Sequence, residues 1–577
     1  MSKRIGPRPS GAAGVARNIP RMTQPAAMRT KTYVYGAQKL NGCDAWAMFV
    51  ACAQGDLTGV KALLEKDPRL ASAQHWYEFP IHMAVRAGHA QIVQLLLDRG
   101  ADPGQSRFTY NSWDKLLQAA KDRGRDQIAT MLQRAMRKRF NYRPEFEALK
   151  DAIISRDSRA IGAVLRRQPE LARSSDALGN SPLHWSVITR QLDLIARFVE
   201  LGTPIDAERA DGQTPVLLAA SGAEDYWYRQ GRGRSHPWLR NTWVLVGSLL
   251  AHGAEYTISV AAAAGDQERI ERLLSQDPTL AARLDPAGSS PLGYAAREGH
   301  LHIVRLLLER GADPNAPEDS APQGRALFEA ACANHLEIAQ LLLERGADPN
   351  AGLDSCGCCL TIGEVYHGKR ARPMQQLLRK FGAYTPPYCM SVAEMKQAIQ
   401  DDHNVVRHEE FLGNVLAKRN AELLELYLDS DPAVLQRMDY HSGVIYPKSA
   451  ALVRKLLARG LDPNRPDWQG KTFLHACAEN ADRGLAALFL DAGADINARD
   501  AEFQGTPLAA AVRSQAHARP NDKPQFAERG RRMVEFLLKR GAATNLPGDE
   551  PWATPLAWAK RYKLDELLAV LIAHGAQ

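Results

Sequence analysis

The segment LLLERGADPNA occurs twice without a change, at residues 306–316 and 341–351, which places the copies 35 residues apart. Self-similarity at a period of 20–50 residues is the sequence signature of a stacked repeat array. A unit of this size cannot bury its apolar face alone, so neighbouring units must stack to make a core. The repeat therefore predicts an array of similar units rather than one globular domain.

A second motif lies upstream of these segments and recurs at nearly the same spacing. Its apolar position is Leu292 in SPLGYAAREGH and Leu327 in the next copy, again 35 residues on. Ser or Thr before Pro favours a helix start, because the hydroxyl caps the helix and Pro fits its first position. Gly311, after HIVRLLLER, fits the left-handed position that ends a helix. Each unit is therefore predicted to be a pair of short helices.

The two motifs resemble the T-P-L-H and G-A-D-P-N signatures of the ankyrin repeat. The resemblance extends over residues 43–577 and implies about 14–15 units at the usual repeat length. It implies an all-α solenoid of stacked helix-turn-helix units with hairpin-like finger loops. For function it implies a scaffold or adaptor that binds other proteins through the concave face made by fingers and first helices, with no catalysis and no cofactor.

Residues 1–42 precede the first unit and differ from it in composition. No acidic residue occurs before Asp44, whereas residues 1–40 carry eight Lys and Arg, which equals the net charge of +8. This basic segment, rich in Pro, Gly and Ala, is predicted to be a disordered tail; a transit peptide or an early start codon are other interpretations. The remainder is charge-neutral, so nucleic acid is not the expected partner.

The period breaks at residues 223–243, where Gly202 and Gly253 are 51 residues apart. Trp, Tyr and Arg are typical of interface hot spots, so we expect this insertion to bind a partner, unless its aromatic side chains only pack among themselves. A second insertion, 513–532, is polar and predicts a solvated loop, and the repeats are most degenerate over 351–450. The predicted partner-binding residues of the first insertion are Tyr226, Trp227, Tyr228, Arg229, Arg232, Arg234, Trp238, Arg240 and Trp243.

Further aromatic residues lie in the fingers near the N-terminus, in HWYEF and RFTYNSW. They are predicted either to line one end of the concave face or to pack between repeats. A basic segment, RAMRKRFNYR at 134–143, could contact phosphate or RNA, but a solvated helix end is the favoured interpretation because cations suit helix C-termini. The finger residues predicted to bind a partner are Trp76, Tyr77, Phe108, Tyr110 and Trp113.

Three cysteines gather in DSCGCCL, at 354–360. The repeat frame puts Leu360 at the Leu of T-P-L-H, so two of the cysteines occupy the Thr and Pro positions, where a thiolate would gain reactivity from the helix N-terminus. A zinc site needs four ligands, so no metal site is predicted and small residues packing the finger are favoured. The candidate ligands of the alternative, a metal- or redox-responsive regulator, are Cys356, Cys358, Cys359, His367 and Cys389.

The remaining expectations concern the protein as a whole. No apolar run reaches the ~18–20 residues that span a bilayer, and eight cysteines in 577 residues do not indicate a disulfide scaffold. We therefore expect a cytoplasmic, monomeric, non-enzymatic protein of bacterial origin with protein partners and no membrane contact. A polyanion-associated protein acting through the basic tail, and an enzyme within 351–450, are the alternatives.

Overall fold

The computed structural model describes residues 22–35, 38–76, 78–103, 116–221, 243–353, 357–407, 410–437, 449–515 and 523–577. The described chain is mostly helical, with two two-stranded sheets, and it divides into two compact units. We call Ala27–Cys389 the large unit, and Met390–Gln577 with the described residues 22–26 the small unit. The boundary falls inside the degenerate stretch 351–450 that the sequence indicated.

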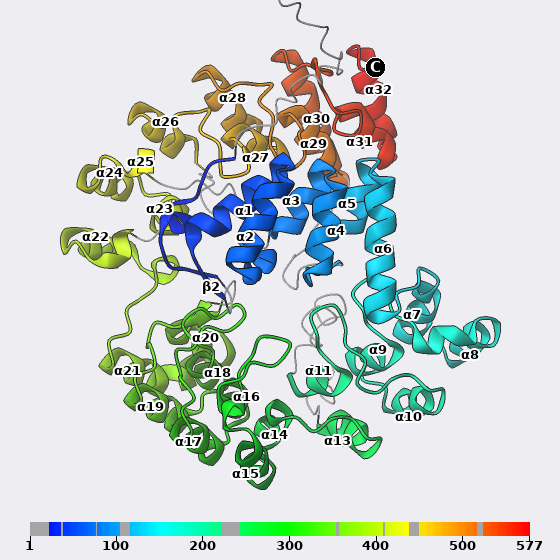
Figure 1. Ribbon diagram of the computed structural model, residues 1–577. Coiled ribbons are helices and arrows are strands. Elements are labelled where there is room, and N and C mark those ends of the chain that lie inside the picture. Colours follow the sequence, from blue (N-terminus) through cyan, green and yellow to red (C-terminus); the bar gives the residue numbers. More distant parts are fainter. Residues whose placement is uncertain are drawn as a thin grey trace, which may run out of the picture. The chain divides into compact units, whose positions relative to one another are not determined.

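Helix pairs in chain order build the large unit (Figure 1). First helices pack on first helices, as α14, α16, α18 and α20 do, and second helices pack on second helices. The pairs are α1 (Gly42–Gln54) and α2 (Leu57–Lys66), α3 (Pro80–Ala87) and α4 (Ala90–Asp98), α5 (Leu116–Asp122) and α6 (Asp126–Phe140), α7 (Phe146–Ile154) and α8 (Ser158–Arg167), α9 (Pro182–Ile188) and α10 (Leu192–Glu200), α11 (Pro215–Ser221) and α13 (Trp243–Ala251), α14 (Ile258–Ala264) and α15 (Gln267–Gln276), α16 (Pro291–Glu298) and α17 (Leu301–Glu309), α18 (Ala326–Ala333) and α19 (Leu336–Glu344), and α20 (Cys359–His367) and α21 (Arg372–Lys380).

The small unit repeats the same arrangement. Its last three helix pairs follow the repeat pattern, whereas the five helices before them, α22 to α26, depart from it. Helix α26 follows a stretch outside the described residues. The helices are α22 (Val392–Gln400), α23 (Glu410–Ala417), α24 (Ala421–Ser430), α25 (Val434–Arg437), α26 (Ala450–Ala458), α27 (Phe473–Glu479), α28 (Arg483–Asp491), α29 (Pro507–Gln515), α30 (Lys523–Lys539), α31 (Pro555–Arg561) and α32 (Asp565–Ala573).

The α16 repeat shows why these residues form this unit. Ser290 caps α16 by accepting a hydrogen bond from Gly293 N at 3.1 Å, and Pro291 takes the first helical position. Gly299 ends the helix at φ 86°, in the left-handed region that glycine enters without a Cβ penalty. Ala295 is fully buried, and a small residue there allows the next first helix to approach. The start and end signals predicted from the sequence are confirmed here.

Where Pro replaces the Gly-Ala ending, the second helix of a pair passes into a short 3-10 helix. These segments are η2 (Pro68–Ser72), η3 (Pro169–Arg173) and η6 (Pro278–Ala281). The residue before each Pro is extended or nearly so, as Asp67 is with ψ 103°, because Pro disfavours the helical conformation of its predecessor. The other 3-10 segments are η1 (Ala26–Arg29), η7 (Gly368–Ala371), η8 (Pro387–Cys389) and η9 (Asn404–Arg407).

Part of the expected disordered tail is ordered instead. Strand β1 (Tyr33–Tyr35) pairs antiparallel with β2 (Gln38–Leu40), and Tyr33 is only 5% exposed. Met28 is fully buried, and Gly42 N donates to Thr30 O at 3.0 Å. The prediction of disorder over 1–42 is therefore wrong for 26–35 and 38–42, because composition does not register these few buried anchors. Residues 1–21 lie outside the described residues.

The second insertion is not simply a loop either. Residues 523–532 of the predicted loop 513–532 form the first part of α30, which has 17 residues whereas α28 has nine. Arg531 bridges to Glu528 at 2.9 Å and to Glu535 at 2.5 Å. Ion pairs between residues three and four positions apart stabilise a helix. The prediction of a solvated loop is therefore wrong for residues 523–532, because polar composition alone does not distinguish a loop from a helix with such pairs. Strands β3 (Gly352–Leu353) and β4 (Gly357–Cys358) form the other sheet.

Candidate functional site

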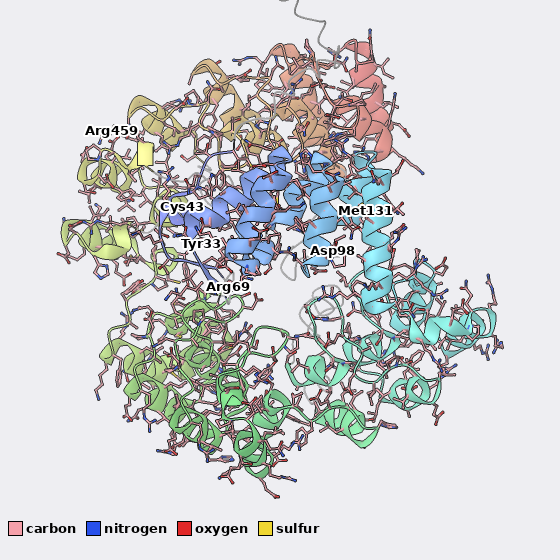
Figure 2. The ribbon with its side chains drawn as sticks, viewed as in Figure 1. Tyr33, Cys43, Arg69, Asp98, Met131 and Arg459 are labelled. Atoms are coloured by element: carbon pink, nitrogen blue, oxygen red, sulfur yellow. The ribbon has the colours of Figure 1, made fainter. Side chains whose placement is uncertain are left out.

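The surface considered as a functional site consists of first helices with the fingers that precede them. We call α3, α9 and α16 of the large unit, with the finger residues 74–79, 175–181 and 285–290, the inner face. Figure 2 displays the side chains of both units and labels Tyr33, whose hydroxyl lies 2.9 Å from Nδ1 of His75 in the first of these fingers. At each of the three positions an acidic finger residue bonds to side chains of the helix that follows it. The inner face therefore carries polar side chains held in defined positions by these bonds, and it is not a continuous row of apolar side chains.

The first finger is a tight hairpin with a tryptophan in its turn. His75 N donates to Glu78 O at 3.0 Å, and Glu78 N donates to His75 O at 2.9 Å. Trp76, between them, has φ 45°, in a region that bulky residues enter at a cost of about 1–3 kcal/mol. Its half-buried ring meets the His75 ring edge to face, with centroids 6.5 Å apart. Strain of this kind clusters at functional sites.

The N-terminal strand supports this finger. Tyr33 OH lies 2.9 Å from Nδ1 of His75 and donates to Gln74 O at 2.9 Å. The rings of Tyr33 and Tyr35 stack with centroids 6.2 Å apart, and both lie about the same distance from His75. The residues predicted to be a free tail thus hold the finger that carries Trp76.

Glu78 joins the same finger to helix α3. Its carboxylate lies 2.6 Å from His82 Nδ1 and 2.9 Å from a terminal guanidinium nitrogen of Arg86. Burial acts to raise the pKa of Glu78, but the positive charges of Arg86 and His82 outweigh it and lower that pKa to about 2. The carboxylate is therefore ionised at neutral pH and fixes the finger against the helix.

The second finger places a tryptophan on helix α9. Trp185 Nε1 donates to Asp176 Oδ2 at 3.0 Å, and the Lys150 ammonium lies 5.8 Å from the Trp185 ring centroid. The other carboxylate oxygen of Asp176 accepts from Leu178 N and Asn180 N, both at 2.9 Å. Leu178 itself is 37% exposed. An indole, a cation and an exposed Leu thus stand together at one finger.

The third finger repeats this geometry with a tyrosine. Tyr294 OH donates to Asp285 Oδ2 at 2.7 Å, and the Arg297 guanidinium lies 5.3 Å from the ring. In both fingers the aspartate precedes the aromatic residue by nine positions. Neither aspartate was predicted from the sequence, although this constant spacing is visible in the repeat frame.

A carboxylate replaces the usual histidine in the α16 repeat. Gly293 stands at the His position of T-P-L-H, and Glu318 from the next finger accepts from Ser290 Oγ at 2.6 Å and Ser290 N at 2.8 Å. Glu318 is 2% exposed, and burial raises the pKa of its carboxyl although Arg325 opposes this. A Cβ on Gly293 would lie 3.6 Å from this carboxylate, an ordinary van der Waals distance.

The buried histidines His184 and His475 at the T-P-L-H position bond to the start of their own helix and to the finger of the next unit. Ser181 N donates to His184 Nδ1 at 3.1 Å, and His184 Nε2 donates to Gln213 O at 2.9 Å. His475 makes the equivalent bonds to Thr472 and to Gly505 O. Both rings are fully buried, and burial lowers the pKa of His184 to about 3. A neutral imidazole whose two nitrogens both make hydrogen bonds within the protein is a structural group and not a general base.

The small unit carries a related charge network between α27 and α29. Arg513 donates to Glu479 at 2.6 Å, and its guanidinium lies 3.4 Å from the Phe503 ring centroid. Lys471 lies 3.1 Å from Glu502. Burial acts to raise the pKa of Glu479, but Lys471 and Arg513 outweigh it and lower that pKa. Each of the two cations in this network pairs with a carboxylate of the same network, which suits a structural role.

The cysteine cluster occupies the positions that the repeat frame predicted. Cys358 is the N-cap residue of α20, and Cys359 is its first helical residue. Cys359 is 1% exposed, its Sγ donates to Ala351 O at 3.0 Å, and burial raises the pKa of its thiol. The reactive thiolate considered for this helix start therefore does not apply to Cys359, because desolvation outweighs the helix N-terminus. Cys356 lies outside the described residues.

The other candidate metal ligands are not brought together. His367 Nε2 donates to Cys332 O at 2.8 Å, and Cys389 is exposed. Within the ranges that the structure describes, no group of three or more His, Cys, Asp or Glu side chains is placed to hold a metal ion. In the same ranges, no helix has both the length and the apolar character that a membrane crossing requires.

Several predicted partner-binding residues cannot be placed. Trp243 begins α13 and packs, half-buried, on the core of the large unit, and Trp76 lies at the finger described above. The following lie outside the described residues: Tyr77, Phe108, Tyr110, Trp113, Tyr226, Trp227, Tyr228, Arg229, Arg232, Arg234, Trp238 and Arg240.

Comparison with known proteins identifies the repeat. A model of three ankyrin repeats matches residues 47–141 and 256–352, and a single-repeat model matches residues 469–501. With the helix pairs and fingers described above, these matches make the fold an all-α ankyrin-repeat solenoid. Ankyrin repeats are protein–protein interaction modules in general, and the class is typically non-enzymatic.

Curated relatives share the repeats over limited regions. The ankyrin repeat protein nuc-2 of Neurospora crassa is 29% identical over 164 residues, 27% of this chain and 14% of that protein. The ankyrin repeat and KH domain-containing protein mask-1 of Caenorhabditis elegans is 24% identical over 305 residues, 47% and 11% respectively. The probable E3 ubiquitin-protein ligase XBOS32 of Oryza sativa subsp. japonica is 28% identical over 214 residues, 31% and 43%. The matches thus span less than half of each relative, and these eukaryotic sources give no support to a bacterial origin.

Proposed function

We propose that this chain is a non-catalytic scaffold that binds a partner protein through the inner face of the large unit. The observation that carries the proposal is Trp76, a bulky residue held at φ 45° at a finger tip. A conformational cost of about 1–3 kcal/mol persists only where the surroundings impose it. Tryptophan is also enriched among residues that dominate binding energy, so an indole presented at this cost fits a binding anchor.

The finger before α9, further along the array, offers a second group of contacts. Trp185 with Lys150, and the exposed Leu178, add an aromatic, a cationic and an apolar contact. Asp176 fixes the Trp185 indole and the backbone at Leu178, so the indole has little side-chain entropy left to lose on binding. A preorganised surface of this kind suits rigid docking of a folded partner.

The test replaces Trp76 with Asn, which tolerates positive φ and removes the indole. Proteins captured by the intact chain and by Trp76→Asn are compared by quantitative mass spectrometry, with the free energy of unfolding measured for both. We expect at least one partner to be lost by more than about tenfold, the effect of about 1.4 kcal/mol or more at a hot spot, while stability changes by less than about 1 kcal/mol because relief of strain offsets lost packing.

A matched control is Leu336→Asn, since Leu336 is 40% exposed on the second helix α19. This variant should retain every partner. If Trp76→Asn captures the same proteins as the intact chain but is less stable by several kcal/mol, the tryptophan is a structural residue and the proposal is wrong.

Location, oligomeric state and a second contact complete the proposal. A cytoplasmic location is supported by the low cysteine content, eight in 577 residues, which does not indicate a disulfide scaffold. We also propose a monomer, and keep the insertion 223–243 as a second contact with the partner on the strength of its Trp, Tyr and Arg content. Deleting residues 223–243 and repeating the capture separates its contribution from that of Trp76.

A further inference from the structure

The C-terminal end of helix α6 concentrates exposed positive charge. Helix α6 has 15 residues, whereas the second helices of the units before and after it, α4 and α8, have nine and ten. The additional residues, 135–140, read AMRKRF; Met136 and Phe140 turn inward and are 1% and 9% exposed. The extension exposes the other side, with Arg137, Lys138 and Arg139.

These cations have no carboxylate partner within the described part of the chain. Neither Arg134, nor any of the three cations of the extension, lies within ion-pair distance of Asp or Glu there. Elsewhere the chain pairs such residues: Lys455 lies 2.7 Å from Glu425, and Arg531 lies 2.5 Å from Glu535. Like charges three and four residues apart destabilise a helix by about 0.2–0.5 kcal/mol per pair. The helix dipole favours cations in a last turn but does not require an extension that carries three.

The adjacent finger brings a further cation, Arg143, to the same place. Asn141 ends α6 at φ 55°, and its Nδ2 donates to Arg173 O at 2.7 Å. Arg143 N donates to Ser175 O at 3.1 Å, and Ser175 Oγ donates to Phe140 O at 2.7 Å. The end of α6 is therefore fixed against residues 173–175. We call Arg134, Arg137, Lys138, Arg139 and Arg143 the α6 basic surface.

Acidic groups near this surface are few. Glu170 lies 3.7 Å from Arg143, where both side chains are more than 40% exposed, so screening leaves the pair weak. Glu147 pairs with Lys150 instead, and Glu145 is exposed at the start of α7. Five cations therefore outnumber the three exposed carboxylates of this region, Glu145, Glu147 and Glu170.

The buried aromatics decide which anion this surface suits. Phe140 and Tyr142, the aromatic residues of the basic segment, are 9% and 8% exposed, so neither offers a ring on which a base could stack. Membrane-surface helices combine basic residues with an exposed apolar side, and the apolar side of this extension is buried. We propose that the α6 basic surface docks an acidic segment of a partner protein, a second contact independent of the inner face.

The experiment measures binding of a fluorescent twelve-residue polyglutamate that carries a photo-crosslinker at one end, using the full chain at low salt. The basic N-terminus also attracts this peptide, so the site of crosslinking is the decisive readout. We expect crosslinks in residues 134–147 and 166–176. Crosslinks should fall at least about tenfold in the triple variant Arg137→Glu, Lys138→Glu, Arg139→Glu and be suppressed as salt shortens the Debye length.

A matched triple variant, Arg305→Glu, Arg310→Glu, Arg345→Glu, makes the same charge change on and after α17 and α19 and should keep these crosslinks within about twofold. A milder variant with Gln at 137, 138 and 139 covers the case in which the Glu variant fails to fold. Equal loss in both Glu variants, or crosslinks confined to residues 1–40, would overturn the proposal. So would tighter, α6-dependent binding of oligothymidine or of anionic vesicles, which would make the partner a nucleic acid or a membrane.

Discussion

The indole Nε1 of Trp185 donates to Oδ2 of Asp176 at 3.0 Å, nine residues earlier in the chain. The same carboxylate also accepts two backbone N–H groups of its own finger. Asp176 is 4% exposed, and burial raises the pKa of its carboxyl against these hydrogen bonds. One buried side chain therefore fixes both the shape of the finger and the orientation of the tryptophan on the first helix.

Replacing Asp176 with Ala should loosen this repeat. Four donors, namely two backbone N–H groups, the side-chain amide of Asn180 and the Trp185 indole, would lose their acceptor, so we expect a local destabilisation of about 2–3 kcal/mol. Hydrogen exchange measured on the peptide that spans residues 174–190 should accelerate by about 30- to 150-fold, which is the same energy expressed as a rate. Trp185→Phe removes only one donor and should cost about 1 kcal/mol. If the two variants exchange equally, Asp176 does not hold the finger.

Acid should weaken the same repeat through His184. Its folded-state pKa is about 3, whereas a histidine in an unfolded chain has a pKa near 6.5. Between these values the unfolded chain binds a proton that the folded chain does not, so stability falls as pH falls below about 6.5. We expect exchange in residues 181–189 to rise between pH 7 and pH 5. In His184→Gln, whose amide does not titrate, this part of the rise should disappear; an unchanged pH dependence would contradict it.

Histidines at the start of second helices should contribute by joining neighbouring repeats. His335 Nε2 donates to Arg297 O at 3.1 Å, and His300 Nε2 donates to Ala263 O at 2.9 Å. Loss of one such bond is expected to cost about 1 kcal/mol, so His335→Ala should lower the thermal unfolding midpoint. His302→Ala is the control, because His302 is exposed on α17. Equal midpoints for the two variants would show that the inter-repeat bond contributes nothing.

Much of the fold can be predicted from the sequence, because each repeat carries residues that mark where its helices begin and end. Ser290, Pro291 and Gly299 each have a local role that does not depend on distant residues. Recurrence alone also places Cys358 and Cys359 at a helix start, which the first turn of α20 confirms. Local signals repeated at a fixed period are the features that sequence reasoning reads best.

The features that sequence reasoning missed involve contacts between distant residues. Tyr33 is ordered by His75, 42 positions away, and Glu318 replaces a histidine from the next finger, 28 positions from Ser290. Neither contact can be predicted from the composition of the chain or from the spacing of apolar residues along a helix. The place of Cys359 at a helix N-terminus predicts a reactive thiol, but its burial depends on tertiary packing and reverses the direction of its pKa shift.

The order in which the cysteines react should follow from that reversal. Cys358 is partly exposed, with its Sγ 3.6 Å from Thr361 Oγ1, whereas Cys359 is buried and its thiol pKa is raised. Because the thiolate is the reactive form, a maleimide at pH 7.5 should label Cys358 at least about tenfold faster than Cys359. Fragment-ion mass spectrometry of the peptide from residues 351 to 369 resolves the two.

Buried Cys52 and Cys477 supply the control within the same sample, since they should stay unlabelled until the chain is unfolded in guanidinium. A Cys359→Ala variant should leave the labelling rate of Cys358 unchanged, because the Cys359 thiol bonds to Ala351 O whereas the Cys358 thiol lies beside Thr361. Labelling of Cys359 as fast as Cys358 in the folded chain would mean that the start of α20 opens readily, and that the cluster is available for redox chemistry after all.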